Sequence, residues 1–386
     1  MNPRFPRSLL LWALLLATSL SSYAYTNFIG HSYTSCLNCH YNPTGGGPLT
    51  DYGRAVSATA ISSKMFYPDA WSEEKVAYTS GFLFRKPKQE WLRTQVNYRG
   101  FQVVRNPGSE KNEQKEWINM QLDGRLILKF GQNDKFVAVG NYGYAPLPEG
   151  VEDQPEWRSR EYYLGYRFSP KFGMYAGLMD KAYGVKVIEH IAFSRTAPQV
   201  AQNDQVHGVL GHYLGEKWEI TGQGFAGNLG QDADLQMKGG SILAERTTFD
   251  LHRIGFSALQ SKNEFLTLQS YALHGRFNLK EGSAILTEVG QTNRKTFNGL
   301  DDRTMRYGLL QTYLRPFRGV YFLSNIEYFN RDIRESDYTV RWGPGLQFFP
   351  VQRVELRLDA YNTRSFSTNA STRDSWMYLF QAHLWL

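Results

Sequence analysis

The sequence predicts an all-β fold: an outer-membrane antiparallel β-barrel of about 16 strands, preceded by a small, mainly α-helical segment. Three observations lead to this prediction. From about Trp91 to the C-terminus the chain alternates in period two, in segments of ten to fifteen residues. After the N-terminal region, no stretch supplies the 18 consecutive apolar residues of a transmembrane helix. The N-terminus itself has the pattern of an export signal.

Composition excludes several classes of protein. Of the 386 residues, 20% are charged, 42% hydrophobic and 15% aromatic, with 35 glycines and two cysteines. The chain is too polar for a helical membrane protein and too rich in aromatic residues and glycine for a disordered one. Two cysteines exclude a disulfide-rich secreted scaffold. The net charge is +7, but the basic residues are scattered along the chain, so we expect no nucleic-acid partner.

Residues 1–24 are predicted to be a secretory signal peptide. Arg4 and Arg7 precede an apolar run that extends from Leu9 to Leu20. Ser22-Tyr23-Ala24 then places small residues where a signal peptidase reads them. The alternative is an N-terminal anchor helix, but the run is about a dozen residues long, short of the ~20 that a bilayer span needs. We therefore expect export and cleavage.

Residues 25–75 are predicted to form a small domain around Cys36-Leu37-Asn38-Cys39-His40. The C-x-x-C-H pattern is the attachment site of c-type haem. Two thiols at this spacing can each form a thioether to one porphyrin, and His40 can bind the iron from below. A redox-active or structural disulfide and half of a zinc site are the alternatives. A zinc site would need a second Cys/His pair and a thioredoxin-like motif a βαβ context, and neither follows. We expect one covalent haem c, held by Cys36, Cys39 and His40.

The residues after the motif predict a turn and then a helix. Gly45-Gly46-Gly47, flanked by prolines, cannot be helical, and glycines let the backbone lie close to a flat ligand or simply form a flexible turn. A helix is predicted to begin with Thr50 or Asp51 as its N-cap. One face of that helix, expected to cover the haem, carries Leu49, Tyr52, Val56 and Ala60.

The second axial ligand of the iron has two candidates in the sequence. Met65 follows the predicted helix, and a methionine there would raise the reduction potential. His31 precedes Cys36 by five residues and is the competing candidate. A residue of the barrel or an open iron site is the remaining alternative.

Residues 76–386 are predicted to form the barrel. The last segment is the clearest, because Tyr378, Phe380 and Ala382 alternate with Leu379, Gln381 and His383. Aromatic residues gather near the segment ends, as in the girdles of membrane barrels. A soluble β-sandwich would also alternate, but in shorter strands. The other clear segments are Trp117 to Phe130, Lys135 to Tyr144, Gly208 to Leu214, Phe265 to Phe277, Tyr307 to Pro316 and Tyr321 to Asn330.

Turn lengths predict the orientation of the barrel, because tight turns face the periplasm and long loops face outward. Tight turns are expected near Ser169-Pro170, Gly215-Glu216, Lys280-Glu281, Pro316-Phe317 and Pro350-Val351. Long connections are expected at Asn106–Glu116, Leu147–Glu156, Asp180–Asn203, Thr292–Asp302 and Thr363–Arg373. The longest, Asp180–Asn203, carries Lys181, Lys186, Glu189, His190 and Arg195. It would narrow the pore if it folded into the lumen, and otherwise it is a surface loop.

These features together resemble the fused monohaem cytochrome–porins, which include the outer-membrane iron-oxidising cytochromes. The resemblance rests on the signal peptide, Ser35-Cys36-Leu37-Asn38-Cys39-His40, Pro43, Leu49-Thr50-Asp51-Tyr52-Gly53-Arg54 and the barrel-like remainder. It covers the whole exported chain in layout, but in motif only Ser35 to about Arg54. It implies that Cys36 and Cys39 hold the haem, that His40 is an axial ligand, and that the porin serves electron transfer across the outer membrane.

The expected function is therefore electron transfer between an extracellular donor or acceptor, for which Fe(II) is one candidate, and a periplasmic cytochrome or other carrier. A haem domain plugging the pore from the periplasmic side would bring the haem within reach of both sides, with His383 on the inward face in position to contact it. The alternatives are a diffusion porin with a regulatory or structural haem and a soluble β-rich cytochrome. We expect outer-membrane lipid as a partner and leave the oligomeric state open. The sequence offers no Ser-His-Asp set or paired carboxylates, so any oxidase activity would be electron transfer at the haem.

Overall fold

The computed structural model describes residues 26–85, 89–109, 112–147, 155–189, 191–279, 281–367 and 370–386. The side chains of 370–373 are not described. The predicted signal peptide, residues 1–24, lies outside the described residues.

Residues 26–85, here called the N-terminal segment, are mostly helical turns. Thr50 is the N-cap that the sequence predicts, since its side chain accepts a hydrogen bond from the backbone N–H of Gly53. No helix in the described ranges is long and apolar enough to cross a membrane. The elements are η1 (Thr26–His31), η2 (Cys36–Asn38), α2 (Asp51–Val56), η3 (Ser57–Ile61), α3 (Glu73–Tyr78) and η4 (Phe82–Phe84).

The rest of the described chain forms a closed antiparallel barrel of 16 strands, which confirms the predicted fold. Each long strand pairs with the next, and β1 pairs with both β2 and β17, which closes the sheet. A two-residue strand, β4 (Trp157–Arg158), adds a short pairing to β3. The barrel strands are β1 (Leu92–Arg105), β2 (Gln114–Phe130), β3 (Phe136–Tyr144), β5 (Tyr162–Ser169), β6 (Phe172–Met179), β7 (Val206–Leu214), β8 (Trp218–Phe225), β9 (Lys238–Thr248), β10 (His252–Lys262), β11 (Leu266–Asn278), β12 (Ala284–Thr296), β13 (Arg303–Phe317), β14 (Val320–Asn330), β15 (Tyr338–Phe348), β16 (Val354–Ser367) and β17 (Ala370–Trp385).

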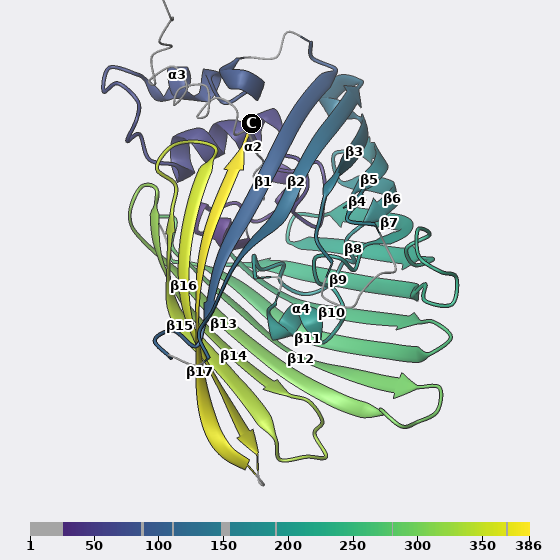
Figure 1. Ribbon diagram of the computed structural model, residues 1–386. Coiled ribbons are helices and arrows are strands. Elements are labelled where there is room, and N and C mark those ends of the chain that lie inside the picture. The colour runs from purple at the N-terminus through teal and green to yellow at the C-terminus, as the bar shows by residue number, and fades with distance from the viewer. Residues whose placement is uncertain are drawn as a thin grey trace, which may run out of the picture.

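The first barrel strand begins at Leu92, close to the change of pattern at Trp91. The predicted domain boundary between residues 75 and 76 falls inside α3. Strand lengths differ around the barrel: β3 and β5 to β8 have 8 or 9 residues, shorter than expected, whereas β2 has 17. One wall is therefore much taller than the other (Figure 1).

The period-two alternation separates an apolar outer face from a polar lumen. On β2, Leu122 and Leu126 are 43% and 47% exposed, whereas Gln121, Asp123 and Arg125 between and beside them are buried. The same pattern puts Tyr378 and Phe380 of β17 outside. Apolar side chains on the outside and polar ones inside are the arrangement of a barrel that faces lipid and encloses a polar interior.

Tight turns gather at the end of the barrel that holds the C-terminus, and the long connections lie at the other end (Figure 1). We call these the tight-turn end and the loop end. One predicted loop is wrong. Thr363–Arg373 is not a loop, because β16 continues to Ser367 and β17 starts at Ala370, where Arg364 and Asp374 form a cross-strand ion pair with Nε and Oδ1 2.6 Å apart.

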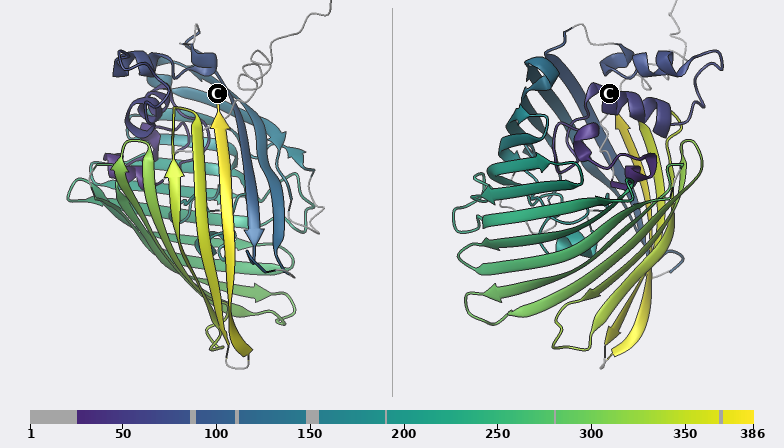
Figure 2. Two further views of the ribbon diagram at one scale, coloured as in Figure 1. Left: turned by 60° about the vertical axis from the view of Figure 1, so that its left-hand side comes forward. Right: turned by 180° about the vertical axis from the view of Figure 1, so that it is seen from behind.

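The N-terminal segment packs into the tight-turn end, beside the C-terminus (Figure 2). Its apolar residues Phe28, Val56 and Ile61 share one buried cluster with Tyr321, Phe349 and Trp385 of the barrel. Burying a side chain of this kind contributes about 1.5–3 kcal/mol, so this cluster is a substantial part of what holds the segment.

Residues 180–205 connect β6 to β7 and fold into the lumen. Of the two alternatives that the sequence left open, this is the one in which the connection lies inside the barrel. We call it the inner loop. It contains α4 (Phe193–Thr196), which contacts β12, β13 and β14 from inside the barrel. His190, named in the sequence as part of this loop, lies outside the described residues.

Candidate functional site

The C-x-x-C-H motif forms a single helical turn that places both sulfurs and the imidazole together. The backbone N–H groups of Cys39 and His40 both donate to the carbonyl of Cys36, over 3.1 Å and 2.9 Å. His40 then pairs with Leu49 in an antiparallel bridge, and Thr50 N donates to the carbonyl of Cys39 over 2.8 Å. The motif and the start of α2 are thereby fixed to each other.

Two glycines allow the chain to approach the cysteines. Gly45 has φ +76°, and a Cβ there would lie 3.1 Å from Cys36 Sγ. Gly53, in α2, leaves no room for a side chain, because its Cβ would lie 2.3 Å from the Cys39 carbonyl oxygen. The tight fold around the two thiols therefore depends on glycine at both positions.

A cavity of about 490 Å³ opens beside the motif. Cys36, Cys39 and His40 line it together with apolar side chains of the N-terminal segment, including Phe28, Val56 and Ile61. Two cations complete the lining: Lys186 from the inner loop and Arg276 from β11.

The predicted helix face covers this cavity in part. Val56 lines it, as expected, and Leu49 is 2% exposed next to His40. Tyr52 is 55% exposed and turns outward, where its hydroxyl bonds to that of Tyr33 over 3.0 Å. The predicted face fails at this point because α2 begins only at Asp51, so Leu49 lies before the helix and does not share a helix face with Tyr52.

Burial sets the protonation of the motif. Burial raises the pKa of Cys36 to about 11 and that of Cys39 to about 12, so both remain thiols. A redox-active C-x-x-C pair requires the opposite, a lowered pKa. Burial, followed by the positive charges of Lys186 and Arg125, lowers the pKa of His40 to about 3. The imidazole is therefore neutral, which is its metal-binding form.

The lumen wall holds the motif through a charged network on β7 to β11. Ser35 Oγ donates to Glu219 Oε1 over 2.7 Å, and Glu219 is also bound by His212 and Arg253. Arg276 donates to the carbonyl of Thr34 over 3.1 Å, which ties the residues just before Cys36 to the wall. The motif is thus fixed to the barrel on one side and to α2 on the other.

The two sequence candidates for the distal iron ligand lie away from this cavity. Met65 is 60% exposed, after the end of η3. His31 Nε2 is hydrogen-bonded to Tyr321 OH at 2.9 Å, and its ring packs against Phe28. Neither residue lines the cavity. His383, which was expected to be in position to contact the plug, is buried in the wall, and its Nδ1 lies 2.8 Å from Glu355 Oε2. Trp385, two residues further along β17, belongs to the buried cluster that includes residues of the N-terminal segment.

The residues around the motif fit a covalently bound haem. A pair of thiols and a neutral imidazole, held by one helical turn, face a cavity that is lined largely by apolar side chains. Lys186 and Arg276 also line the cavity and would supply positive charge to the carboxylates of a haem. Arg276 could not be identified from the sequence, because its nearness to Thr34 depends on how the strands close into a barrel. Lys186 belongs to the long connection, and nothing in the sequence indicated that it would line the cavity beside the motif.

Comparisons with known proteins agree on the fold. No known family matches the sequence, and no curated protein matches it either. Among solved structures, OmpT of Vibrio cholerae has a TM-score of 0.60 and 9% identity, covering 78% of this chain and 99% of its own. The outer-membrane channel DcaP of Acinetobacter baumannii has a TM-score of 0.55 and 11% identity, covering 79% and 99%.

The anion-selective porin of Comamonas acidovorans has a TM-score of 0.55 and 8% identity, covering 76% of this chain and 99% of its own. At these identities the similarity concerns architecture. The chain has the closed barrel fold of the outer-membrane porins.

Proposed function

We propose that this protein is an outer-membrane cytochrome–porin that transfers electrons across the outer membrane, between an extracellular donor or acceptor and a periplasmic carrier. The observation that carries the proposal is the cavity in which Cys36, Cys39 and His40 meet inside the mouth of a porin-type barrel. Fe(II) is one candidate donor.

A haem c bound there supplies a one-electron couple. Cys36 and Cys39 would hold it through their sulfur atoms, and His40 would provide a ring nitrogen to the iron. Phe28, Val56 and Ile61 exclude water from that side of the cavity, which lowers the local dielectric. Met65 or His31 would reach the distal position only after moving from the places described above.

The N-terminal segment would act as a plug in the periplasmic mouth. Its carbonyl groups accept hydrogen bonds from arginines at the tight-turn end, and Asp51 is held by Arg93 of β1 through two contacts of 2.7 Å each. Barrels of this size leave an aqueous lumen unless it is filled. A plug that carries the haem would reach the lumen on one face and the periplasm on the other.

The experiment is a redox-difference spectrum of purified outer membranes, before and after addition of Fe(II). We expect a c-type spectrum in the wild type that is absent from the Cys36→Ser, Cys39→Ser double variant. Reduction of that haem by Fe(II) supports iron as the donor. Reduction by other donors but not by Fe(II) excludes iron as the donor and still supports electron transfer across the outer membrane. A wild-type protein without covalent haem contradicts the proposal.

A diffusion porin with a structural haem is the second candidate, and the similarity to porins and to a channel favours it. It predicts solute flux through the intact protein that does not change with redox state. Liposome swelling with small sugars, measured in oxidant and in reductant, separates the two: the plugged conduit gives little flux in either state.

A further inference from the structure

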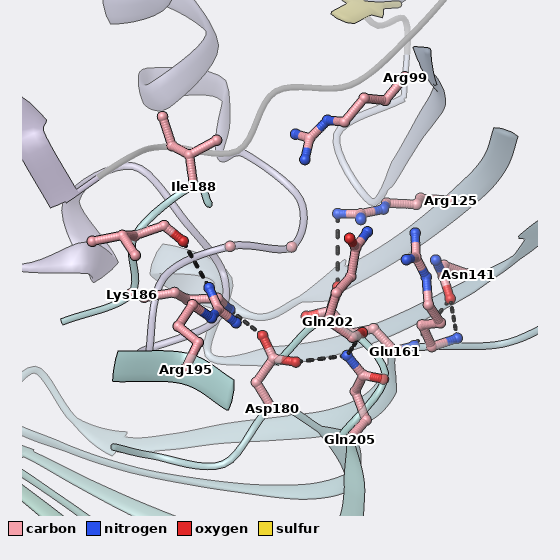
Figure 3. A pocket seen from close by; sticks show the side chains of 14 residues that line it. Arg99, Arg125, Asn141, Glu161, Asp180, Lys186, Ile188, Arg195, Gln202 and Gln205 are labelled. Atoms are coloured by element: carbon pink, nitrogen blue, oxygen red, sulfur yellow. Dashed lines mark hydrogen bonds and ion pairs between the residues drawn. The ribbon is translucent and has the colours of Figure 1, made fainter. Parts of the chain in front are cut away.

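A second cavity, of about 750 Å³, lies between the glycine turn that follows His40, the barrel wall and the inner loop (Figure 3). We call it the arginine chamber. Gly46 and Gly47 form part of its wall and lie beside the His40 ring. The chamber and the proposed haem site are therefore neighbours: Lys186 lines both, and Gly45 of the haem site is followed directly by the two glycines of the chamber.

Cations outnumber carboxylates in the lining of this chamber. Figure 3 shows Arg99 and Arg125 reaching in from the wall, and Lys186 and Arg195 from the inner loop. With Arg160 these make five cations, against the two carboxylates Glu161 and Asp180. A third carboxylate, Asp123, stands behind them, 3.5 Å from Arg125 and 3.8 Å from Arg160.

The carboxylates are already engaged. Asp180 accepts from Lys186 and from Gln205, and Glu161 Oε1 accepts from Asn42 of the N-terminal segment over 3.0 Å. Arg195, by contrast, donates to the uncharged carbonyls of Val187 and Val200. A buried excess of positive charge is costly unless an anion offsets it.

We propose that the arginine chamber binds a small polycarboxylate anion, free or as a metal chelate. Guanidinium groups pair with carboxylates in bidentate geometry, and five cations around one cavity can pair with more than one carboxylate of the same ligand. A consequence, which rests on the proposed function, is that a dissolved iron donor entering through the lumen arrives as a carboxylate chelate. The hydrated Fe²⁺ cation is repelled by the same charges.

The probe is citrate alone, titrated calorimetrically into the purified full-length protein, with inorganic phosphate as the comparison. We expect one citrate per chain, weakened about tenfold or more in Arg160→Gln, since a charged hydrogen-bonding partner is lost. Arg306→Gln, on the exposed face of β13, is the matched control and leaves the affinity unchanged.

Three results overturn the proposal: no citrate binding, equal binding in both variants, or phosphate binding as tightly as citrate. If Arg160→Gln fails to fold, the salt dependence of wild-type binding takes its place. Affinity that falls steeply with ionic strength supports the charged chamber, and salt-independent binding contradicts it. Haem content is measured separately by its absorption, so a protein that lacks haem but binds citrate refutes only the proposed electron transfer.

Discussion

Two segments fill this barrel, and charged residues of the wall bind the backbone of each in a different way. The N-terminal segment is held at the tight-turn end by arginines that donate to carbonyl groups at helix ends. Arg318 binds the carbonyls of Ser62 and Ala58, and Arg315 binds that of Ala60. Cations at the C-terminal end of a helix meet both its unpaired carbonyls and its dipole.

The inner loop is held by carboxylates that accept from backbone N–H groups. Glu288 accepts from Val185 over 2.6 Å, and Glu327 accepts from Phe193 over 2.8 Å. This loop has little regular structure, so its N–H groups need partners inside the lumen. Arg341 of the wall also donates to the carbonyl of Ile191 in this loop. The comparison teaches that the wall binds the N-terminal segment through carbonyls at helix ends and the inner loop through both N–H and carbonyl groups.

The largest expected effect comes from removing one of the two segments altogether. A barrel without residues 26–69 should conduct several-fold more current in planar bilayers than the intact protein, because the inner loop alone does not fill the tight-turn mouth. Single-channel recording of both forms measures this. Equal conductance would mean that the N-terminal segment is not a plug.

A single arginine at the tight-turn end is the next test. Arg318→Ala removes the hydrogen bonds to Ala58 and Ser62 and the ion pair with Glu73. A hydrogen bond to a charged group contributes about 1.5–3 kcal/mol, so the N-terminal segment should open more often. Limited proteolysis of the folded protein should cut within residues 26–85 about tenfold faster or more. Arg306→Ala is the control, and equal cleavage of the two variants would contradict the anchoring role.

Acid should loosen the inner loop. Burial alone would raise the pKa of Asp180, but Lys186 and Arg195, with hydrogen bonds from Lys186 and Gln205, lower it to about 2. Because the folded pKa is depressed, the stability from ionised Asp180 is present above about pH 4 and is lost as the pH falls towards 2.

The difference between the pKa of Asp180 in the folded protein and its ordinary value corresponds to roughly 2 kcal/mol of stability, since one pKa unit is about 1.4 kcal/mol. Denaturant unfolding between pH 5 and pH 2 should show this loss in the wild type and not in Asp180→Asn. Parallel pH profiles for the two proteins would show that Asp180 does not hold the loop.

The smallest effect tests the approach of the glycine turn to the motif. Gly45→Ala forces a side chain into positive φ and against Cys36 Sγ, at a cost of about 1–2 kcal/mol. Gly108→Ala is matched in φ, +78°, but meets nothing within 4 Å, so it bears the backbone cost alone. Covalent haem per protein, read from absorbance, should fall in the first variant only. Equal haem content in the Gly45→Ala and Gly108→Ala variants would show that the glycine turn is not part of the proposed haem site.

Features that depend on residues close together in the sequence could be predicted, whereas features that depend on long-range contacts could not. Alternation with period two identified the strands, and the cap at Thr50 and the motif around His40 depend on neighbours within about ten residues. The end of β16 was missed because its polar residues look like a loop until Arg364 meets Asp374 across the strands. The cavity residue Arg276 and the arginine chamber depend on strand closure and on the path of the inner loop, which no short pattern encodes.

The most direct measurement is the mass of the tryptic peptide that ends at Arg54, isolated from protein made in a cell that matures c-type cytochromes. The sequence has no other lysine or arginine between Arg7 and Arg54, so this peptide carries both cysteines and His40. We predict that it has the added mass of one haem, attached at Cys36 and Cys39. A peptide with free thiols or a disulfide would contradict the account.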